Sequence, residues 1–309
     1  MQAVREIDQS FASLRIGTAA VHLNLALFPL YDDREKPSEY LLLDDALDRK
    51  LARVTEVSAD GRVPELAFEN DSVEKILLVD GDELVGSKQN RVLNLSILVG
   101  SRQKLVIPVS CVEQGRWRYD SRDFRSARRS LFAKARAKKM RQVTESLRLN
   151  QDRRSNQSEV WADVAGKVAF CQADSDTLAM ADAYQSRDRQ LSAYVSAFQA
   201  EKGQRGAVVA IDGKAVGLEL FDSANAFARY LEKLVRSYAL DAIETEAGKA
   251  LAPSEADVRR FLDSIRAAAA ERFPAVGEGE DIRLTGEGVS GGALMANGRV
   301  VHLAGFAMP

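Results

Sequence analysis

The sequence predicts an α+β protein, in which a β-rich first part is followed by a part built of helices and hairpins. Short apolar runs with a period of two residues fill the chain up to about residue 115. A helical period of apolar residues begins near Phe124, and a hairpin pattern returns near the C-terminus. The 309 residues contain neither a GxGxxG nor a P-loop motif, which argues against a Rossmann or nucleoside-triphosphatase fold.

The length and composition set the number of domains that the chain can form. With 46% hydrophobic and 28% charged residues, the chain suffices for one large or two ordinary domains with a core. We expect a β-sandwich or jelly-roll-like sheet portion over residues 1–120. An α+β portion, with a long basic helix, is expected over residues 121–309, and its C-terminal hairpin, at about 281–307, is expected to rejoin a sheet. One continuous domain is the alternative.

The cysteines and the apolar stretches indicate the cellular compartment in which the protein functions. Cys111 and Cys171 are the only cysteines, which favours packed or free thiols in a reducing compartment over a disulfide framework. The longest apolar stretch near the N-terminus, residues 21–30, is too short to span a bilayer. We therefore expect a cytoplasmic protein without a membrane partner. The net charge of -2 gives no overall field that would attract nucleic acid.

The first part contains at least six strand candidates, which are bounded by turn residues. Two of them, residues 92–99 and 105–112, alternate apolar and polar side chains around a polar connection that begins at Gly100, so we expect a hairpin. In the register that turns both apolar faces to the core, Leu93 lies opposite Cys111 and Arg91 opposite Glu113. The other candidates are Val21 to Tyr31, Leu51 to Val57, Leu66 to Phe68 and Val73 to Val79.

Arg91 and Glu113 would thus lie on the same face as the apolar residues of their strands, at the end of the strands where the core meets solvent. Amide and guanidinium groups gather around them beside a Trp, a mixture that suits a small ligand with planar and anionic parts. The alternative is a structural cross-strand ion pair that contributes roughly 0.2–1 kcal/mol. We predict a ligand site made of Glu83, Lys88, Gln89, Asn90, Arg91, Glu113, Arg116 and Trp117.

Other catalytic chemistry finds little support in the sequence. His22 and His302 are the only histidines, so we expect no Ser-His-Asp set, no metal and no cofactor. Cys111 ends an apolar strand face and is expected to pack rather than to act as a nucleophile. Glu83 and Glu113 are the remaining candidates for an acid and a base in glycosidic cleavage. Arg91 beside Glu113 would lower the pKa of that carboxyl and favour a permanent charge.

A long helix is expected over residues 124–149, because this stretch contains neither Gly nor Pro and carries an apolar stripe. Residues 115–155 hold fourteen Lys and Arg but only four Asp and Glu, so the charge is strongly segregated. The simpler interpretation is a helix that rests on the acidic remainder of its own fold or of a second subunit. The alternative is a phosphate-binding surface. Nucleic acid is a less favoured partner, because the stretch lacks interleaved aromatic residues.

The rest of the chain alternates helices and hairpins. A short helix around Trp161 and a helix from about Leu178 that ends before Gly203 are expected. Residues 207–221 form a hairpin around Asp212-Gly213, and Ser223 is a good N-cap for the helix that follows. Another helix opens after Pro253-Ser254, and the last hairpin turns at Asn297-Gly298.

Seven segments carry a resemblance to a known family. In chain order they are GDELVGSKQNRVLN (81–94), IPVSCVEQGRW (107–117), KKMRQVTESLR (138–148), QSEVWADV (157–164), VGLELFDS (216–223), LVRSYALDAI (234–243) and GGALMANGRVVHLAGF (291–306). Together they resemble the ARG and Rhodanese-Phosphatase-superfamily-associated Protein domain, in which ARG denotes ADP-ribosylglycohydrolase. The resemblance implies a prokaryotic domain without an established activity, linked by genomic association to ADP-ribose and NAD-derived metabolites. Its matching motif residues are Glu83, Lys88, Gln89, Asn90, Arg91, Glu113 and Trp117.

Three functions of different classes therefore remain open. The leading hypothesis is binding of a nucleotide-like small molecule, in line with the ADP-ribose or NAD association that the resemblance implies. The second is a hydrolase acting on such a ligand, with Glu83 or Glu113 as the base. The third is an interaction or self-assembly module, in which the basic helix docks an acidic partner or a second copy in a homo-oligomer.

Overall fold

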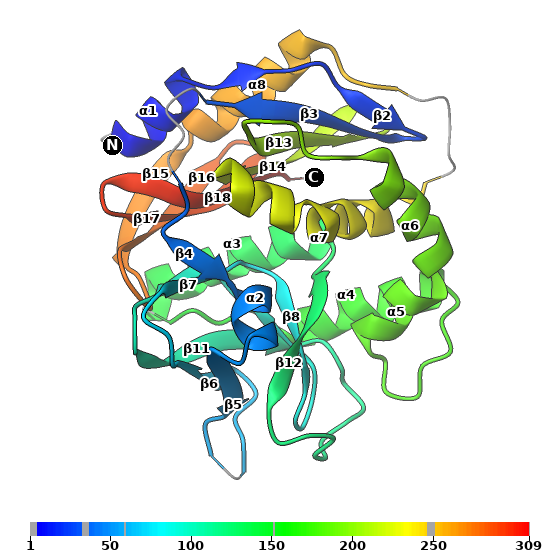
Figure 1. Ribbon diagram of the computed structural model, residues 1–309. Coiled ribbons are helices and arrows are strands. Elements are labelled where there is room, and N and C mark those ends of the chain that lie inside the picture. Colours follow the sequence, from blue (N-terminus) through cyan, green and yellow to red (C-terminus); the bar gives the residue numbers. More distant parts are fainter. Residues whose placement is uncertain (1–4, 33–36, 59, 151, 246–250, 309) are drawn as a thin grey trace. The chain divides into compact units, whose positions relative to one another are not determined.

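The computed structural model describes residues 5–32, 37–58, 60–150, 152–245 and 251–308. Helices and several sheets alternate along the chain, which confirms the α+β class (Figure 1). The chain divides into two compact units. Unit 1 comprises residues 1–38, 192–275 and 279–309, and unit 2 comprises residues 39–191 and 276–278. Position 120, where the composition changes, lies inside unit 2.

The described part of unit 1 contains one nine-stranded antiparallel sheet. Its strands are β1 (Arg15–Ile16), β2 (Ala20–His22), β3 (Leu25–Tyr31), β13 (Gln204–Ile211), β14 (Lys214–Phe221), β15 (Ala269–Pro274), β16 (Glu280–Gly286), β17 (Val289–Ala296) and β18 (Arg299–Ala307). The order is β1-β3-β13-β14-β18-β17-β16-β15, and β2 pairs with β3. Strands β17 and β18 form the hairpin predicted around Asn297-Gly298, where both residues have a positive φ, and this hairpin is part of the sheet.

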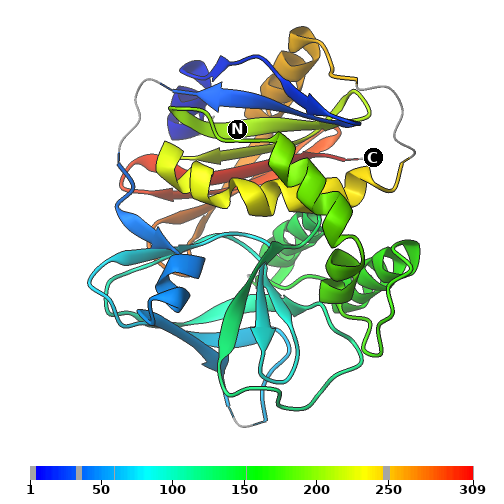
Figure 2. The same ribbon diagram turned by 45° about the vertical axis from the view of Figure 1, so that its right-hand side comes forward.

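Helices lie on both faces of the sheet of unit 1 (Figures 1 and 2). Residues of α1 (Arg5–Ala12) and α8 (Glu255–Arg266) share a hydrophobic core with one face of the sheet. Helix α7 (Ala224–Ala242) packs against β13 and β14 on the opposite face. Helix α8 begins after Ser254, as predicted, and the structure adds a capping box between Ser254 and Asp257.

Unit 2 contains two further sheets in its described residues. The six-stranded sheet has the order β12-β8-β9-β11-β6-β5, and its edge strands β12 and β5 approach each other. The three-stranded sheet has the order β10-β7-β4, and both sheets contribute to one hydrophobic core. The strands are β4 (Tyr40–Leu42), β5 (Ala52–Glu56), β6 (Glu65–Asn70), β7 (Lys75–Leu78), β8 (Asp82–Gly86), β9 (Arg91–Leu93), β10 (Ile97–Val99), β11 (Lys104–Cys111) and β12 (Phe124–Ser130).

Four helices complete the elements between residues 39 and 191, and a fifth crosses the boundary between the units. Unit 2 holds α2 (Leu43–Asp48), α3 (Ala133–Asn150), α4 (Gln157–Phe170) and α5 (Met180–Ser186), while α6 (Asp188–Ala197) crosses from one unit to the other. The single helix expected from about Leu178 to Phe198 is therefore wrong, because the chain turns at Arg187 between α5 and α6.

The hairpin expected between residues 92–99 and 105–112 is also wrong. The first run splits into β9 and β10, and β10 pairs with β7 of the other sheet. Strand β11 pairs with β9 so that Cys111, and not Glu113, lies opposite Arg91. Backbone bonding to β11 extends to Asn94, whose N–H donates to the Pro108 carbonyl, and the side chain of Asn94 accepts from Ser110 and donates to the Arg153 carbonyl. The chain then passes to the other sheet at β10. The observed register of β9 and β11 differs from the predicted one by two residues. Because side chains alternate between the faces with a period of two, the predicted face of each residue in these strands is still correct.

The long basic helix begins later than the sequence predicted. Residues 124–130 form β12, which pairs with β8 and contains an irregularity where Arg128 adopts a positive φ. Pairing with β8 thus decides the conformation of a stretch whose composition favours a helix. The helix itself, α3, begins only at Ala133.

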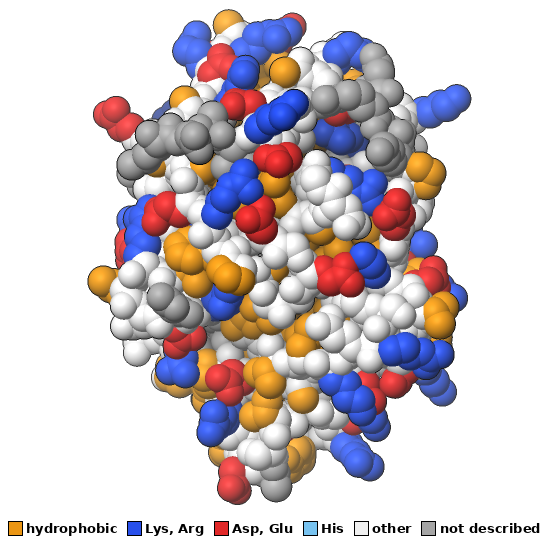
Figure 3. Space-filling model, turned by 90° about the vertical axis from the view of Figure 1, so that its left-hand side faces the viewer, with side chains coloured by type: hydrophobic (Ala, Val, Ile, Leu, Met, Phe, Trp, Pro, Cys, Tyr) orange, Lys and Arg blue, Asp and Glu red, His pale blue; other side chains and the backbone are white. Residues whose placement is uncertain are grey.

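The charges of α3 are largely matched within unit 2. Arg136 and Lys139 are buried and both contact Asp80, and Lys138 contacts Asp163 (3.1 Å) and Glu159 (3.2 Å). On the face shown in Figure 3, acidic and basic side chains are interspersed, without an extended patch of one sign. Among the described residues, no helix combines the length and the apolar character needed to cross a bilayer.

Candidate functional site

Residues from the turn between β8 and β9 meet the segment that follows β11. Oε2 of Glu113 accepts hydrogen bonds from the Asn90 backbone N–H (3.1 Å) and from Arg116 Nη2 (2.7 Å). Oε1 of Glu113 accepts from the Thr177 hydroxyl (2.9 Å), and its carbonyl accepts from Gln89 Nε2 (3.0 Å). Arg116 also donates to Oδ1 of Asn90 (3.0 Å). This network holds the two segments together.

The network keeps Glu113 ionised. Burial raises the pKa of this carboxyl, but the hydrogen bonds from Arg116, Asn90 and Thr177 and the charge of Arg116 lower the pKa by more. The net pKa therefore lies below its ordinary value. Arg116 supplies the neighbouring positive charge that the sequence analysis assigned to Arg91. A carboxylate with three donors in place is a permanent acceptor and brace rather than a proton donor.

We expect the stability that Glu113 contributes to depend on pH. A carboxyl whose pKa is lower in the folded state stabilises the protein above its unfolded pKa, about 4.3, and loses this effect as the pH falls. Glu113→Gln should therefore cost about 1–3 kcal/mol at pH 7 and less below about pH 4. Urea unfolding at both pH values measures the difference, with the exposed Glu74→Gln as the control. A cost that grows on acidification would contradict the lowered pKa.

Arg91 lies fully buried at the start of β9. Its Nη1 donates to Oε1 of Gln89 (3.1 Å), whereas Nε and Nη2 have no hydrogen-bond partner among the described residues. The guanidinium carbon lies 5.7 Å from the centroid of the Trp117 ring. Burial lowers the pKa of Arg91, since the charged form is removed from water. Arg91 is thus a cation held at a cost beneath an aromatic ring.

Lys88 lies between two aromatic rings that are open to solvent. Its ammonium is 5.2 Å from the centroid of Trp117 and 5.0 Å from that of Tyr119, and it donates to the Asp60 carbonyl (2.7 Å). Trp117 is 48% exposed and Tyr119 is 53% exposed. Cation–π contacts of this kind contribute about 0.5–1 kcal/mol at exposed sites. They fix both rings while leaving part of each ring accessible to a ligand.

Glu83 pairs with Arg129 rather than with another of the predicted site residues. It lies in β8, fully buried, and its Oε2 accepts from Arg129 Nε (2.9 Å). Its Oε1 has no hydrogen-bond partner in the described part of the chain. Burial raises the pKa of Glu83, and the charge and hydrogen bond of Arg129 offset this only in part. The structure thus brings together the other seven predicted residues and joins Glu83 to Arg129.

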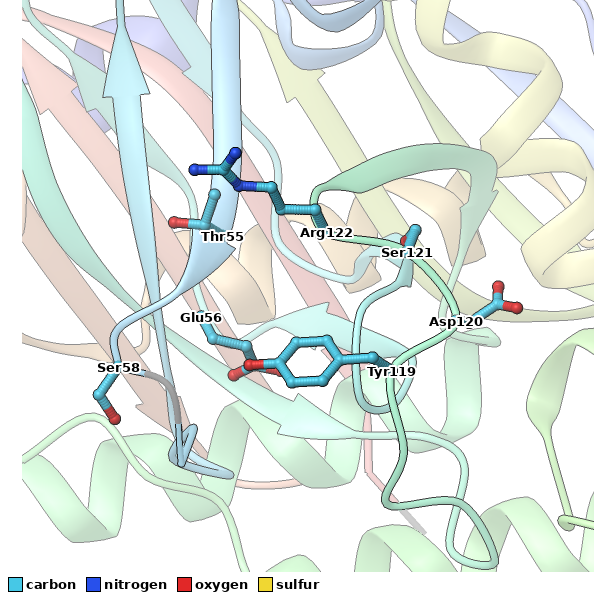
Figure 4. A pocket seen from close by; sticks show the side chains of 7 residues that line it. All are labelled: Thr55, Glu56, Ser58, Tyr119, Asp120, Ser121 and Arg122. Atoms are coloured by element: carbon cyan, nitrogen blue, oxygen red, sulfur yellow. The ribbon is translucent and has the colours of Figure 1, made fainter.

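A pocket of about 690 Å³ opens between the end of β5 and the loop that precedes β12 (Figure 4). The hydroxyl of Ser87, next to Lys88, donates to Oε1 of Glu56 in the pocket wall (3.2 Å), which links the pocket to the β8–β9 turn. Oε2 of Glu56 has no hydrogen-bond partner among the described residues. The pocket is lined by Thr55, Glu56, Ser58, Tyr119, Asp120, Ser121 and Arg122.

The residues that line this pocket were not among those predicted from the sequence. The predicted site ended at Trp117, although the alternation of basic and aromatic residues in Arg116-Trp117-Arg118-Tyr119 could have extended it toward Arg122. Glu56 gave no such signal, because only the fold brings the end of β5 to the loop at residues 119–122. The described residues hold no group of three or more His, Cys, Asp or Glu side chains suited to a metal ion.

Comparison with known proteins gives one match. A family model described as the ARG and Rhodanese-Phosphatase-superfamily-associated Protein domain matches residues 13–306. No curated protein and no solved structure matches the chain.

Proposed function

Because this chain belongs to the ARG and Rhodanese-Phosphatase-superfamily-associated Protein domain family, we propose that it binds a nucleotide-like small molecule related to ADP-ribose or NAD. The binding site is the pocket between the end of β5 and residues 119–122. Binding takes place in the cytoplasm, where such metabolites occur and where the buried thiols of Cys111 and Cys171 stay reduced.

The observation that carries the proposal is the set of groups around this one pocket. Tyr119 offers an exposed ring on which a planar base can stack. Glu56 lines the pocket with a carboxylate whose Oε2 is buried and has no hydrogen-bond partner among the described residues, so a ribose hydroxyl that displaces the covering side chains can donate to it. Arg122 offers a guanidinium for an anionic group. Base, sugar and phosphate each find a side chain of matching chemistry.

The predicted site residues support the pocket from behind. Lys88 contacts both Trp117 and Tyr119 and holds the rings in place. The bonds of Asn90 and Arg116 to Glu113 fix the turn that carries Lys88. Because these side chains are already ordered, ligand binding has a smaller unfavourable entropy change. We therefore assign Lys88 and Trp117 to the rim, and Gln89, Asn90, Arg91, Glu113 and Arg116 to its support.

ADP-ribose should raise the melting temperature of the full chain and bind in isothermal titration calorimetry. Tyr119→Ala should weaken binding by about 1–3 kcal/mol, the usual loss for a stacked base. Glu56→Gln should weaken it too, because the amide presents one acceptor in place of two. Glu74→Gln, an exposed carboxylate elsewhere in unit 2, is the matched control and should bind like the wild type. Full binding by both pocket variants would place the site elsewhere.

One observation favours hydrolysis of the same ligand as a second function. Glu83 is a carboxyl with a raised pKa, and such groups are common among catalytic acids and bases. It is fully buried and does not line the pocket, so hydrolysis would require the scissile bond of the ligand to reach β8. Glu113 is the weaker candidate, since its pKa is lowered. Chromatography of the calorimetry samples distinguishes the two functions. Product that accumulates with the wild type but not with Glu83→Gln would establish hydrolysis, whereas intact ligand indicates binding alone.

A further inference from the structure

A second pocket, of about 440 Å³, adjoins the first within unit 2. It lies over β5, β6 and β11, and its floor includes Ala67 and Val106, which are direct partners in the antiparallel ladder. Thr55 and Arg122 border both pockets, so the two pockets meet at these residues. Figure 4 shows both side chains at the edge of the larger pocket.

The charges around this junction are not equivalent. In the second pocket Glu69 pairs with Arg53 (3.0 Å) and with Lys104, so these three side chains satisfy one another. Arg122 makes neither a hydrogen bond nor an ion pair within the described ranges of the chain. A guanidinium presents five donors in a planar fork that fits phosphate and carboxylate groups. Arg122 thus keeps these donors available at the place where the two pockets meet.

We propose that the two pockets together bind one ligand made of two ring-bearing parts, whose negatively charged linkage lies against Arg122. The planar part occupies the larger pocket beside Tyr119, and the second ring lies over Ala67 and Val106 in the smaller one. This inference rests on the proposed function, and it narrows the ligand to nucleotides that carry a second sugar or nucleoside through a phosphate linkage. A mononucleotide would fill the larger pocket and reach Arg122 but leave the smaller pocket empty.

A series of three ligands tests this arrangement by titration calorimetry on the full chain. Adenosine reaches the larger pocket, AMP adds the anion, and ADP-ribose adds the second ring. We expect AMP to bind about tenfold more tightly than adenosine, or tighter still, because its phosphate accepts a charge-assisted hydrogen bond from Arg122. ADP-ribose should bind tighter again. Arg122→Gln should remove the step from adenosine to AMP, since Gln keeps the polar side chain but lacks the charge.

Val106→Trp isolates the second step. Val106 is 50% exposed and borders the smaller pocket, so a Trp fills that pocket without entering the core. This variant should bind AMP like the wild type and ADP-ribose no tighter than AMP. Arg118→Gln, which removes the same charge from the same loop outside both pocket linings, is the control and should keep all three affinities.

Two outcomes separate this inference from the proposed function. If the wild type binds adenosine, AMP and ADP-ribose equally and Tyr119→Ala weakens all three, the larger pocket binds nucleosides but the two-part arrangement is wrong. The arrangement is also wrong if Arg122→Gln lowers every affinity by one common factor. If none of the three ligands binds, both the two-part arrangement and the proposed function are overturned.

Discussion

Replacing Asp80 by Asn is expected to lower the free energy of unfolding by about 3–5 kcal/mol. Asp80 is buried beside two buried cations of α3, with Arg136 Nε 3.3 Å from its Oδ2 and Lys139 in contact with its Oδ1. Lys139 also donates to the Leu93 carbonyl (2.8 Å), so it cannot turn away without losing a second bond. Asn removes the charge but keeps the shape, which leaves two cations in a medium of low polarity.

The matched control is Asp48→Asn. Asp48 pairs with Arg128 at the surface, where both side chains are more than half exposed, so its loss should change the stability by less than about 1 kcal/mol. Urea unfolding of the full chain, followed by circular dichroism, measures both variants. If Asp80→Asn and Asp48→Asn lowered the free energy of unfolding by the same small amount, water would have to reach the charges of Asp80, Arg136 and Lys139.

Replacing Arg91 by Met is expected to separate stability from binding. Arg91 is buried with two of its three guanidinium nitrogens unbonded among the described residues, so its removal relieves the cost of desolvation. The loss of its bond to Gln89 opposes that gain. The free energy of unfolding should therefore stay within about 1 kcal/mol of the wild type. ADP-ribose should bind about tenfold more weakly, because Trp117 loses the cation beneath it and the wall near Glu56 loses its positive charge.

Arg49→Met is the control for this second prediction, since Arg49 is an exposed cation that pairs with Glu74 (3.9 Å) outside the linings of both pockets. Its ligand-free melting curve should match that of the wild type. Thermal unfolding with and without ADP-ribose gives both quantities for each variant. A loss of several kcal/mol in ligand-free Arg91→Met would instead make Arg91 a structural residue of the β8–β9 turn.

Elements whose signals are local could be predicted from residue types. The strands at residues 51–57 and 105–112 follow from a period of two, and β5 and β11 lie there. The turns at Asp212-Gly213 and Asn297-Gly298 follow from residues that tolerate a positive φ. The start of α8 follows from the Ser254 cap. These features depend on neighbours in the chain, so no knowledge of distant contacts is needed to predict them.

Strand pairing, by contrast, depends on contacts between distant parts of the chain. Nothing in residues 92–99 shows that Asn94 binds Ser110 and the Arg153 carbonyl, or that the run divides between two sheets after Asn94. Residues 124–130 favour a helix by composition, and nothing in them shows that they pair with β8. This pairing makes them strand β12 instead. The interactions that stabilise a strand pair join residues that are distant in the chain. They cannot be evaluated until the fold shows which strands are neighbours.

The candidate site shows the same division. The motif residues from Lys88 to Arg91 could be recognised as polar groups at the end of an apolar face. Their partners could not, because the register moves Arg91 opposite Cys111 and gives Glu113 to Arg116. The pocket needs the end of β5 beside residues 119–122, two segments more than sixty positions apart along the chain. Composition identifies the groups that can bind a ligand, whereas only the curled sheet decides which of them border one cavity.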